Sequence, residues 1–174
     1  MSNGELDRRA FRDLSYGLYI VTSRDGDRLN GQIVNTVIQV TSDPAKVAVA
    51  INKKNLTHDF IIQSKHFGVS VLDEAAPMTF IGLFGFRSGR DTDKLSKVVH
   101  KQGVTGCPLV TDHALSILDA EVLESIDLGS HTIFVGRVLF SEVVREGQPL
   151  TYRYYHETMK GKSPPTAPSF TPVK

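Results

Sequence analysis

Apolar and polar positions alternate along most of the chain, and this pattern predicts mainly β-strands. Runs rich in β-branched and aromatic residues are separated by turn-forming pairs such as Asp25-Gly26 and Asp43-Pro44. The pattern predicts strands over residues 18–22, 32–41, 47–51, 66–72, 116–128, 131–144 and 150–155. The run 131–144 is apolar at consecutive positions, so we expect a strand that is buried on both faces.

Helical periodicity is limited to three short segments. Ser2 and Glu5 have the spacing of a capping box, and apolar residues then recur on one helical face up to Gly17. That face carries Leu6, Ala10, Phe11 and Leu14. Two more short helices are predicted over residues 57–63 and 77–83, the second with a proline near its start.

The order of these elements indicates the fold class. Strands predominate and no regular βαβ alternation is present, which favours a closed or partly closed antiparallel barrel over a doubly wound sheet. We therefore expect a mainly β fold, an antiparallel β-barrel with a few short helices, formed by residues 1–159. Residues 160–174 contain four prolines, so we expect this tail to run extended over a surface.

Composition excludes several classes of protein. Charged residues make up 22% of the chain and cancel to a net charge of +1 without any block of one sign, so no nucleic-acid partner is expected. Charges among the first twenty residues and the absence of a long apolar run argue against a signal peptide or a membrane partner, and we expect a cytoplasmic protein. One cysteine and six histidines without an i, i+4 pair make a metal site unexpected.

The segment 52–58 is a candidate anion site. It lies between a predicted strand and a predicted helix, where free backbone amides and the positive end of the helix dipole attract negative charge. The candidate binding residues are Asn52, Lys53, Lys54, Asn55 and Thr57. Helix caps are commoner than anion sites, so the alternative is that Asn55 or Thr57 only caps the helix while both lysines are solvated.

Two further segments could contact a ligand. In the loop 84–94, glycines permit close approach of the backbone, and Arg87, Ser88, Gly89 and Lys94 offer positive charge and hydrogen bonds; the alternative is an ordinary polar loop. In the segment 30–36, polar side chains interrupt an otherwise strand-like run, and Asn35 or Thr36 must point inward at some barrel position. A buried amide or hydroxyl needs a partner, which could be a planar heterocycle or equally the backbone.

These segments, in this order, resemble the flavin reductase-like FMN-binding family. The resemblance rests on Asn35-Thr36, the segment 52–58, Ser88-Gly89-Arg90-Asp91 with Lys94, and the strand 131–138. The segment 151–168 is similar to a subgroup that contains the flavin domains of high-molecular-weight rubredoxins and archaeal ferric reductases. The resemblance implies a split-barrel homodimer with FMN near the subunit interface, and a tail that packs on the surface or on the dimer partner.

The resemblance also implies roles for individual residues. It places the flavin ring and ribityl chain near Asn35 and Thr36. It places the phosphate against Lys54, Asn55 and Thr57, with Ser88, Gly89 and Lys94 closing the site. His131, Tyr155 and His156 are the candidates for the side where a nicotinamide or another electron partner stacks, although a histidine that opens a strand often only satisfies a turn.

The function that the resemblance implies is reduction of flavin or ferric iron with NADH or NADPH, by hydride transfer to flavin N5. A first alternative is an electron carrier with permanently bound FMN and a redox partner protein. A second is a barrel that binds another phosphorylated ligand or heme. Two departures are visible: Ser130 stands where many relatives have aspartate, and a single cysteine cannot form the four-cysteine site of a rubredoxin domain.

Overall fold

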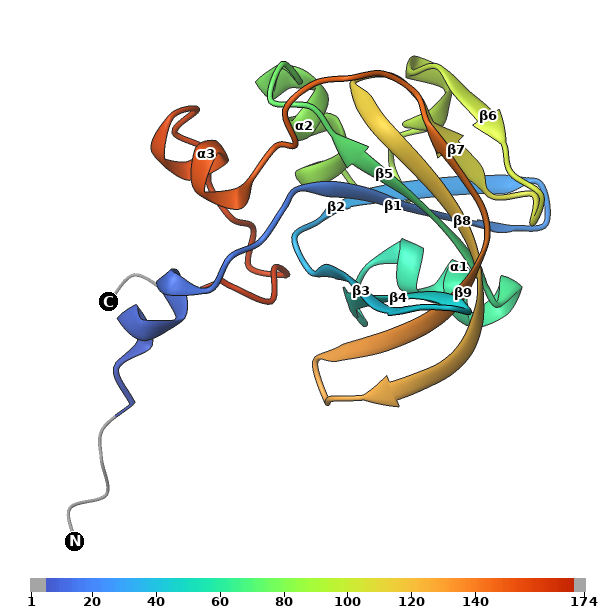
Figure 1. Cartoon of the computed structure of the whole chain (residues 1–174), viewed down its shortest axis with the longest axis horizontal. Helices are drawn as coiled ribbons and strands as arrows, with labels where there is room; N and C mark the ends of the chain where they lie inside the picture. The colour runs from blue at the N-terminus through green and yellow to red at the C-terminus, as the bar shows by residue number, and fades with distance from the viewer. Residues whose placement is uncertain (1–5, 171–174) are drawn as a thin grey trace, which may run out of the picture.

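The computed structural model describes residues 6–170 and is built mainly of antiparallel strands (Figure 1). The strands are β1 (Tyr19–Asp25), β2 (Arg28–Val34), β3 (Val37–Ser42), β4 (Ala45–Asn52), β5 (His66–Leu72), β6 (His100–Gln102), β7 (Pro108–Val110), β8 (Ala114–Asp127) and β9 (His131–Val143). The α-helices are α1 (Leu56–Ser64), α2 (Met78–Gly85) and α3 (Tyr152–Glu157), and the 3-10 helices are η1 (Arg8–Asp13) and η2 (Leu95–Lys97).

Seven strands form one sheet in the order β2-β1-β5-β8-β9-β4-β3, and every pair is antiparallel. The strands at the two ends of this order, β2 and β3, are joined by only Asn35 and Thr36. The two ends of the sheet therefore meet, and the Ala50 amide donates to the Thr36 carbonyl at 3.2 Å beside the junction. The result is an antiparallel split β-barrel, as the sequence and the resemblance predict.

The barrel interior is filled by large apolar side chains. Phe67 and Phe134 are fully buried inside it, together with Val21 and Ile51. Gly136 on β9 is required by this packing, because a Cβ there would lie 2.6 Å from the Phe67 ring. A second apolar cluster, which includes Leu18, Phe84, Leu150 and Tyr155, holds α2 and α3 against the outside of the sheet (Figure 1).

Several boundaries differ from the prediction for physical reasons. The predicted strand 32–41 is two strands, because the chain turns at Asn35-Thr36. The prediction that 131–144 is buried on both faces is wrong for its second half, where Leu139 and Val143 are exposed. The predicted strand 150–155 is mostly helix α3, because Thr151 accepts a hydrogen bond from the Tyr154 amide and caps a helix.

The predicted N-terminal helix is only partly described. Ser2 and Glu5, the proposed capping box, lie outside the described residues. From Arg8 to Asp13 the chain forms a 3-10 helix capped by Asp7, and Leu6, Phe11 and Leu14 are exposed rather than packed on the core. Figure 1 shows this segment projecting away from the barrel.

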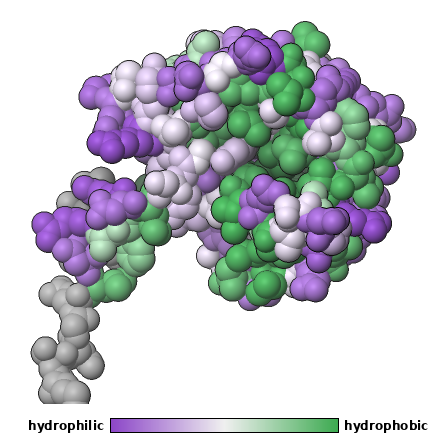
Figure 2. All heavy atoms as spheres, viewed as in Figure 1, coloured by the Kyte–Doolittle hydropathy of each residue, from purple (hydrophilic) through white to green (hydrophobic). Residues whose placement is uncertain are grey.

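Apolar side chains also gather on the barrel surface (Figure 2). They come from the outer face of β3, from the far half of β8 and from the turn that follows β8. The exposed side chains there are Ile38, Val40, Leu123, Ile126 and Leu128. A helix with the length and hydropathy needed to cross a membrane is not found among residues 6–170.

Candidate functional site

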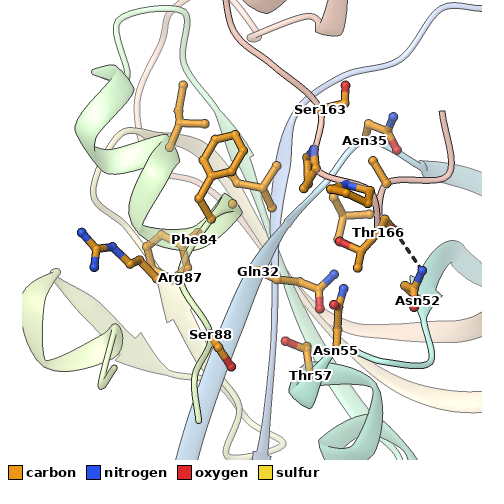
Figure 3. Close-up of a pocket in the computed structure, with 18 of the residues that line it drawn as sticks. Gln32, Asn35, Asn52, Asn55, Thr57, Phe84, Arg87, Ser88, Ser163 and Thr166 are labelled. Carbon is orange, nitrogen blue, oxygen red and sulfur yellow. Dashed lines mark hydrogen bonds between the residues drawn. The ribbon is translucent and has the colours of Figure 1, made fainter. Parts of the chain in front are cut away.

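A cavity of about 520 Å³ opens between β2, the end of β4 and the start of α1. The end of α2, the loop that follows it, α3 and the tail complete its wall (Figure 3). Of the residues that the sequence and the resemblance single out, the cavity wall contains Asn35, Asn52, Lys54, Asn55, Thr57, Arg87, Ser88, Gly89, Lys94 and Tyr155. Three segments far apart in the chain therefore meet at one place.

The start of α1 gives the cavity a corner that attracts negative charge. Asn55 is the N-cap, but its side chain makes no capping hydrogen bond and lines the cavity instead. The first-turn amides of a helix have no intrahelical partner, and Lys54 stands beside them. Thr57 is fully buried, and its hydroxyl accepts a hydrogen bond from Asn30 Nδ2 at 2.9 Å.

Lys53, by contrast, lies outside the cavity and pairs with Asp127.

The loop after α2 is fastened to this corner. Arg90 donates to the Asp59 carboxylate at 2.9 Å and to the Lys54 carbonyl at 3.4 Å, so the loop and α1 are held together. Gly89 lies against Asn30, where an added Cβ would come within 2.0 Å of Asn30 Oδ1. Only glycine brings the loop backbone this close to the corner.

Lys94 adds a buried positive charge. Its side chain is almost inaccessible, and Nζ donates to the Gly31 carbonyl at 2.8 Å. Within residues 6–170 it forms no ion pair with a carboxylate. Desolvation lowers its pKa to about 8. An anionic ligand in the cavity would supply the missing negative charge.

The side-chain oxygen of Gln32 is a hydrogen-bond acceptor that receives no hydrogen bond from the described residues. This atom, Oε1, is buried, yet the side chain lines the cavity. Figure 3 shows it next to Asn55 and Thr57. A buried polar atom that lacks a partner is destabilising, so this oxygen is suited to an N–H group of a ligand.

The tail closes the cavity from the other side. Residues 162–168 line it, and the side chains of Asn35 and Asn52 hold the tail in place. Asn35 Nδ2 donates to Ser169 Oγ at 2.7 Å. Asn52 Nδ2 donates to the Thr166 carbonyl at 3.3 Å, the dashed line in Figure 3. Thr36 does not line the cavity; its hydroxyl donates to Asn35 Oδ1 at 3.0 Å and orients that amide.

Of the three candidates for the nicotinamide side, Tyr155 lines the cavity, whereas His131 and His156 do not. The Tyr155 hydroxyl donates to the Lys162 carbonyl at 3.0 Å. Burial raises the pKa of Tyr155, so this hydroxyl stays protonated. His131 donates to the Thr166 carbonyl at 3.2 Å, and His156 donates to the Gly161 carbonyl at 2.9 Å. Both histidines lie outside the cavity wall and support the tail.

Several polar residues of the wall were assigned no role from the sequence, although Asn30 and Gln32 lie in the segment 30–36 that was singled out. They are Asn30, Gln32, Tyr152, Lys162, Ser163 and Thr166. Asn30 and Gln32 are two positions apart on β2, so both side chains point to the same face of the sheet. Two amides on one face of a short strand are a signal for a polar cavity that the sequence did contain.

Replacing Lys94 tests the electrostatic description of the cavity. In the free protein Lys94→Met should raise the free energy of unfolding by about 1–2 kcal/mol at pH 7, because it removes a desolvated charge at the expense of one hydrogen bond. The lowered pKa makes the folded state release its proton before the unfolded state does. Wild-type stability therefore rises relative to the variant between pH 8 and 10.5, and the advantage of the variant disappears.

Chemical denaturation of both proteins at several pH values checks this expectation. The difference between the two free energies of unfolding should shrink across that pH window. A difference that stays constant from pH 7 to 10.5 would show that Lys94 is not a desolvated charge.

The fold is a split barrel, and its cavity combines a helix start, a buried lysine and an unpaired acceptor, groups that suit an anionic ligand with an N–H donor. The chain belongs to the flavin reductase like domain family, whose model matches residues 11–161. This confirms the resemblance seen in the sequence.

Two relatives match over nearly the whole chain. The chain is 49% identical to a ferric-chelate reductase (NAD(P)H) of Archaeoglobus fulgidus, over 93% of this chain and 96% of the relative. It is 48% identical to a high molecular weight rubredoxin of Moorella thermoacetica, over 95% of this chain and 72% of the relative. Among solved structures, an FMN-binding protein of Thermus thermophilus is similar with a TM-score of 0.73 and 25% identity, over 86% of this chain and 84% of the other.

Proposed function

We propose that this protein is an FMN-dependent reductase that takes electrons from NADH or NADPH and delivers them to a flavin or a ferric acceptor. The observation that carries the proposal is the cavity, which combines the start of α1, the buried Lys94 and the unpaired acceptor of Gln32. The ferric-chelate reductase of Archaeoglobus fulgidus, at 49% identity, supports the reaction type.

The chemistry of the cavity fits FMN. Lys54, Asn55 and Thr57 would hold the phosphate, because a helix start binds phosphate through amides and charge. Gln32 Oε1 would accept a hydrogen bond from the ring N–H. Phe84, Phe86 and the tail supply apolar walls, and Asn35, Ser88, Gly89 and Lys94 would enclose the rest. When bound, FMN supplies a ring that accepts a hydride and releases single electrons.

The residues of the chain then have three tasks. They bind and orient the two cofactors, because hydride transfer between nicotinamide and flavin needs no protein acid or base. Lys94 and the free amides of α1 offset negative charge. Tyr155 and the residues 162–168 exclude water from one side of the cavity. Single substitutions should therefore affect FMN affinity more than the rate of the chemical step.

Steady-state assays test the reaction. Purified protein, saturated with FMN, should oxidise NADH or NADPH and reduce two equivalents of a ferric chelate per nucleotide, since each nucleotide releases two electrons. Removal of FMN should abolish this activity. No turnover with either nucleotide, at FMN concentrations that saturate binding, would contradict a reductase.

A second candidate is an electron carrier with permanently bound FMN and a redox protein as partner. The 48% identity to a high molecular weight rubredoxin favours it. In that case both nucleotides should leave bound FMN oxidised, whereas a reduced rubredoxin or ferredoxin should reduce it.

We also propose that two copies of the chain form a homodimer, in keeping with the resemblance. The support is the set of exposed apolar side chains on β3 and β8, named above, which a second copy could cover. Light scattering coupled to size exclusion should give twice the chain mass of 19.2 kDa. A monomer that still binds FMN would contradict the dimer.

A further inference from the structure

A second hollow, of about 510 Å³, lies on the outer side of α2 next to the FMN cavity. Its wall includes Thr79, Leu83, Phe86, Arg87, Thr92 and Lys97. Phe86 and Arg87 line both spaces, so the two spaces are adjacent and a long ligand that extends along these residues would contact both. We call it the α2 hollow.

The α2 hollow offers an aromatic ring between two positive charges. Phe86 follows the end of α2, and 53% of its surface is exposed. Arg87 and Lys97 are also exposed, and within residues 6–170 neither is paired with a carboxylate. Figure 3 shows the Arg87 guanidinium turned away from Asn55 and Thr57, so it is not directed at the anion corner of the FMN cavity.

Among residues 6–170, the acidic residues of the same segment form no ion pair with Arg87 or Lys97. Asp91 and Asp93 belong to the loop between α2 and η2. Asp93 Oδ1 accepts a hydrogen bond from the Ser96 amide at 3.2 Å and so caps η2. Arg87 and Lys97 thus remain available to an external anion, and two cations beside an aromatic ring suit a phosphorylated nucleoside.

We propose that the α2 hollow binds the adenosine end of NADPH, with Arg87 and Lys97 on the 2′-phosphate and Phe86 beside the adenine. The proposal rests on the proposed function, because the nicotinamide end must reach the FMN cavity. NADH lacks the 2′-phosphate and gains nothing from the two charges. The protein should therefore use NADPH with a specificity constant about 10–100-fold above that for NADH, the range expected for charge-assisted bonds to a partly exposed phosphate.

Binding of nucleotide fragments tests the α2 hollow without turnover. By calorimetry, adenosine 2′,5′-bisphosphate should bind the FMN-loaded protein about tenfold or more tightly than 5′-AMP, and Arg87→Ala should remove the difference. Equal binding of the two fragments would overturn the proposal, because the hollow would then recognise any phosphate or none. This outcome leaves the reductase function intact if NADH still reduces FMN.

A charge reversal provides the kinetic test. Lys97→Glu should raise KM for NADPH about tenfold or more and change KM for NADH by less than about twofold. Lys65→Glu is the matched control: it makes the same charge change on an exposed residue after the C-terminal end of α1, and it should alter neither value. An equal effect of Lys97→Glu on both nucleotides would overturn the assignment.

Discussion

Gly89→Ala should weaken FMN binding by about 100-fold. The added Cβ would lie 2.0 Å from Asn30 Oδ1, and Asn30 is buried and cannot move into solvent. To relieve the overlap, Asn30 must release its hydrogen bond to Thr57, or the loop must withdraw from the start of α1. Either change leaves a buried polar group unpaired and opens the cavity, which together cost about 2–3 kcal/mol.

Titration of FMN, followed by quenching of its fluorescence, measures this effect. Gly85→Ala is the matched control, because Gly85 lines the same cavity but its nearest neighbour would be Ile33 at 3.6 Å, an ordinary contact. Unchanged affinity in Gly89→Ala would mean that the ligand does not use the loop. A similar loss in both variants would mean that any methyl group added to this wall disturbs the protein.

Lys54→Ala combined with Thr57→Ala should weaken FMN binding by about 30-fold or more. The two substitutions remove a positive charge and a hydroxyl beside the free amides of α1, and charge-assisted hydrogen bonds to phosphate contribute about 1.5–3 kcal/mol. The loss should be much smaller for riboflavin, which has no phosphate. Affinity for FMN and riboflavin should therefore become similar.

Lys53→Ala controls for the loss of general positive charge. Lys53 is the direct neighbour of Lys54, but it pairs with Asp127 outside the cavity. Its removal should change FMN affinity by less than about threefold, since only a screened, exposed charge is lost. If Lys53→Ala weakens FMN binding as much as Lys54→Ala combined with Thr57→Ala does, the phosphate does not bind at the start of α1.

Much of the barrel could be predicted from local patterns. β5 has the predicted bounds His66–Leu72, and the turns at Asp25-Gly26 and Asp43-Pro44 separate strands as expected. These features depend on alternation and on turn residues, which neighbouring positions determine. The division between β2 and β3 was missed because it depends on closure of the barrel, a contact between the two ends of the sheet.

Elements at the edges of the fold were harder to predict. Tyr152, Tyr154 and Tyr155 have high β-propensity, yet they form α3 because Thr151 caps it and Tyr155 packs into the cluster around α2. The second half of β9 was predicted to be buried, and Leu6 and Phe11 were predicted to share one face of a helix, but the single chain buries none of these apolar side chains. A sequence pattern shows that a face is apolar; it does not show whether the same chain or a second copy covers it.

The candidate site was predictable where one segment carries both charge and a helix start. Lys54, Asn55 and Thr57 were expected together and lie together. Gln32 and Asn30 lie two positions apart on β2, which is a local signal that was not used. The tail contributes through hydrogen bonds from Asn35, Asn52 and His131, which no local pattern reveals. The roles of all these residues in FMN binding, and a cytoplasmic location, stay predictions.

We propose that this cavity holds FMN and that a nicotinamide nucleotide reduces it there. Anaerobic rapid mixing of protein carrying one FMN per chain with excess NADPH tests this, while the absorption band of oxidised flavin is followed. We predict a single-turnover loss of this band that is at least about a thousandfold faster than with free FMN, a modest part of the range of enzymatic rate enhancements. A band that decays no faster than it does with free FMN would show that the protein does not promote reduction of FMN by NADPH.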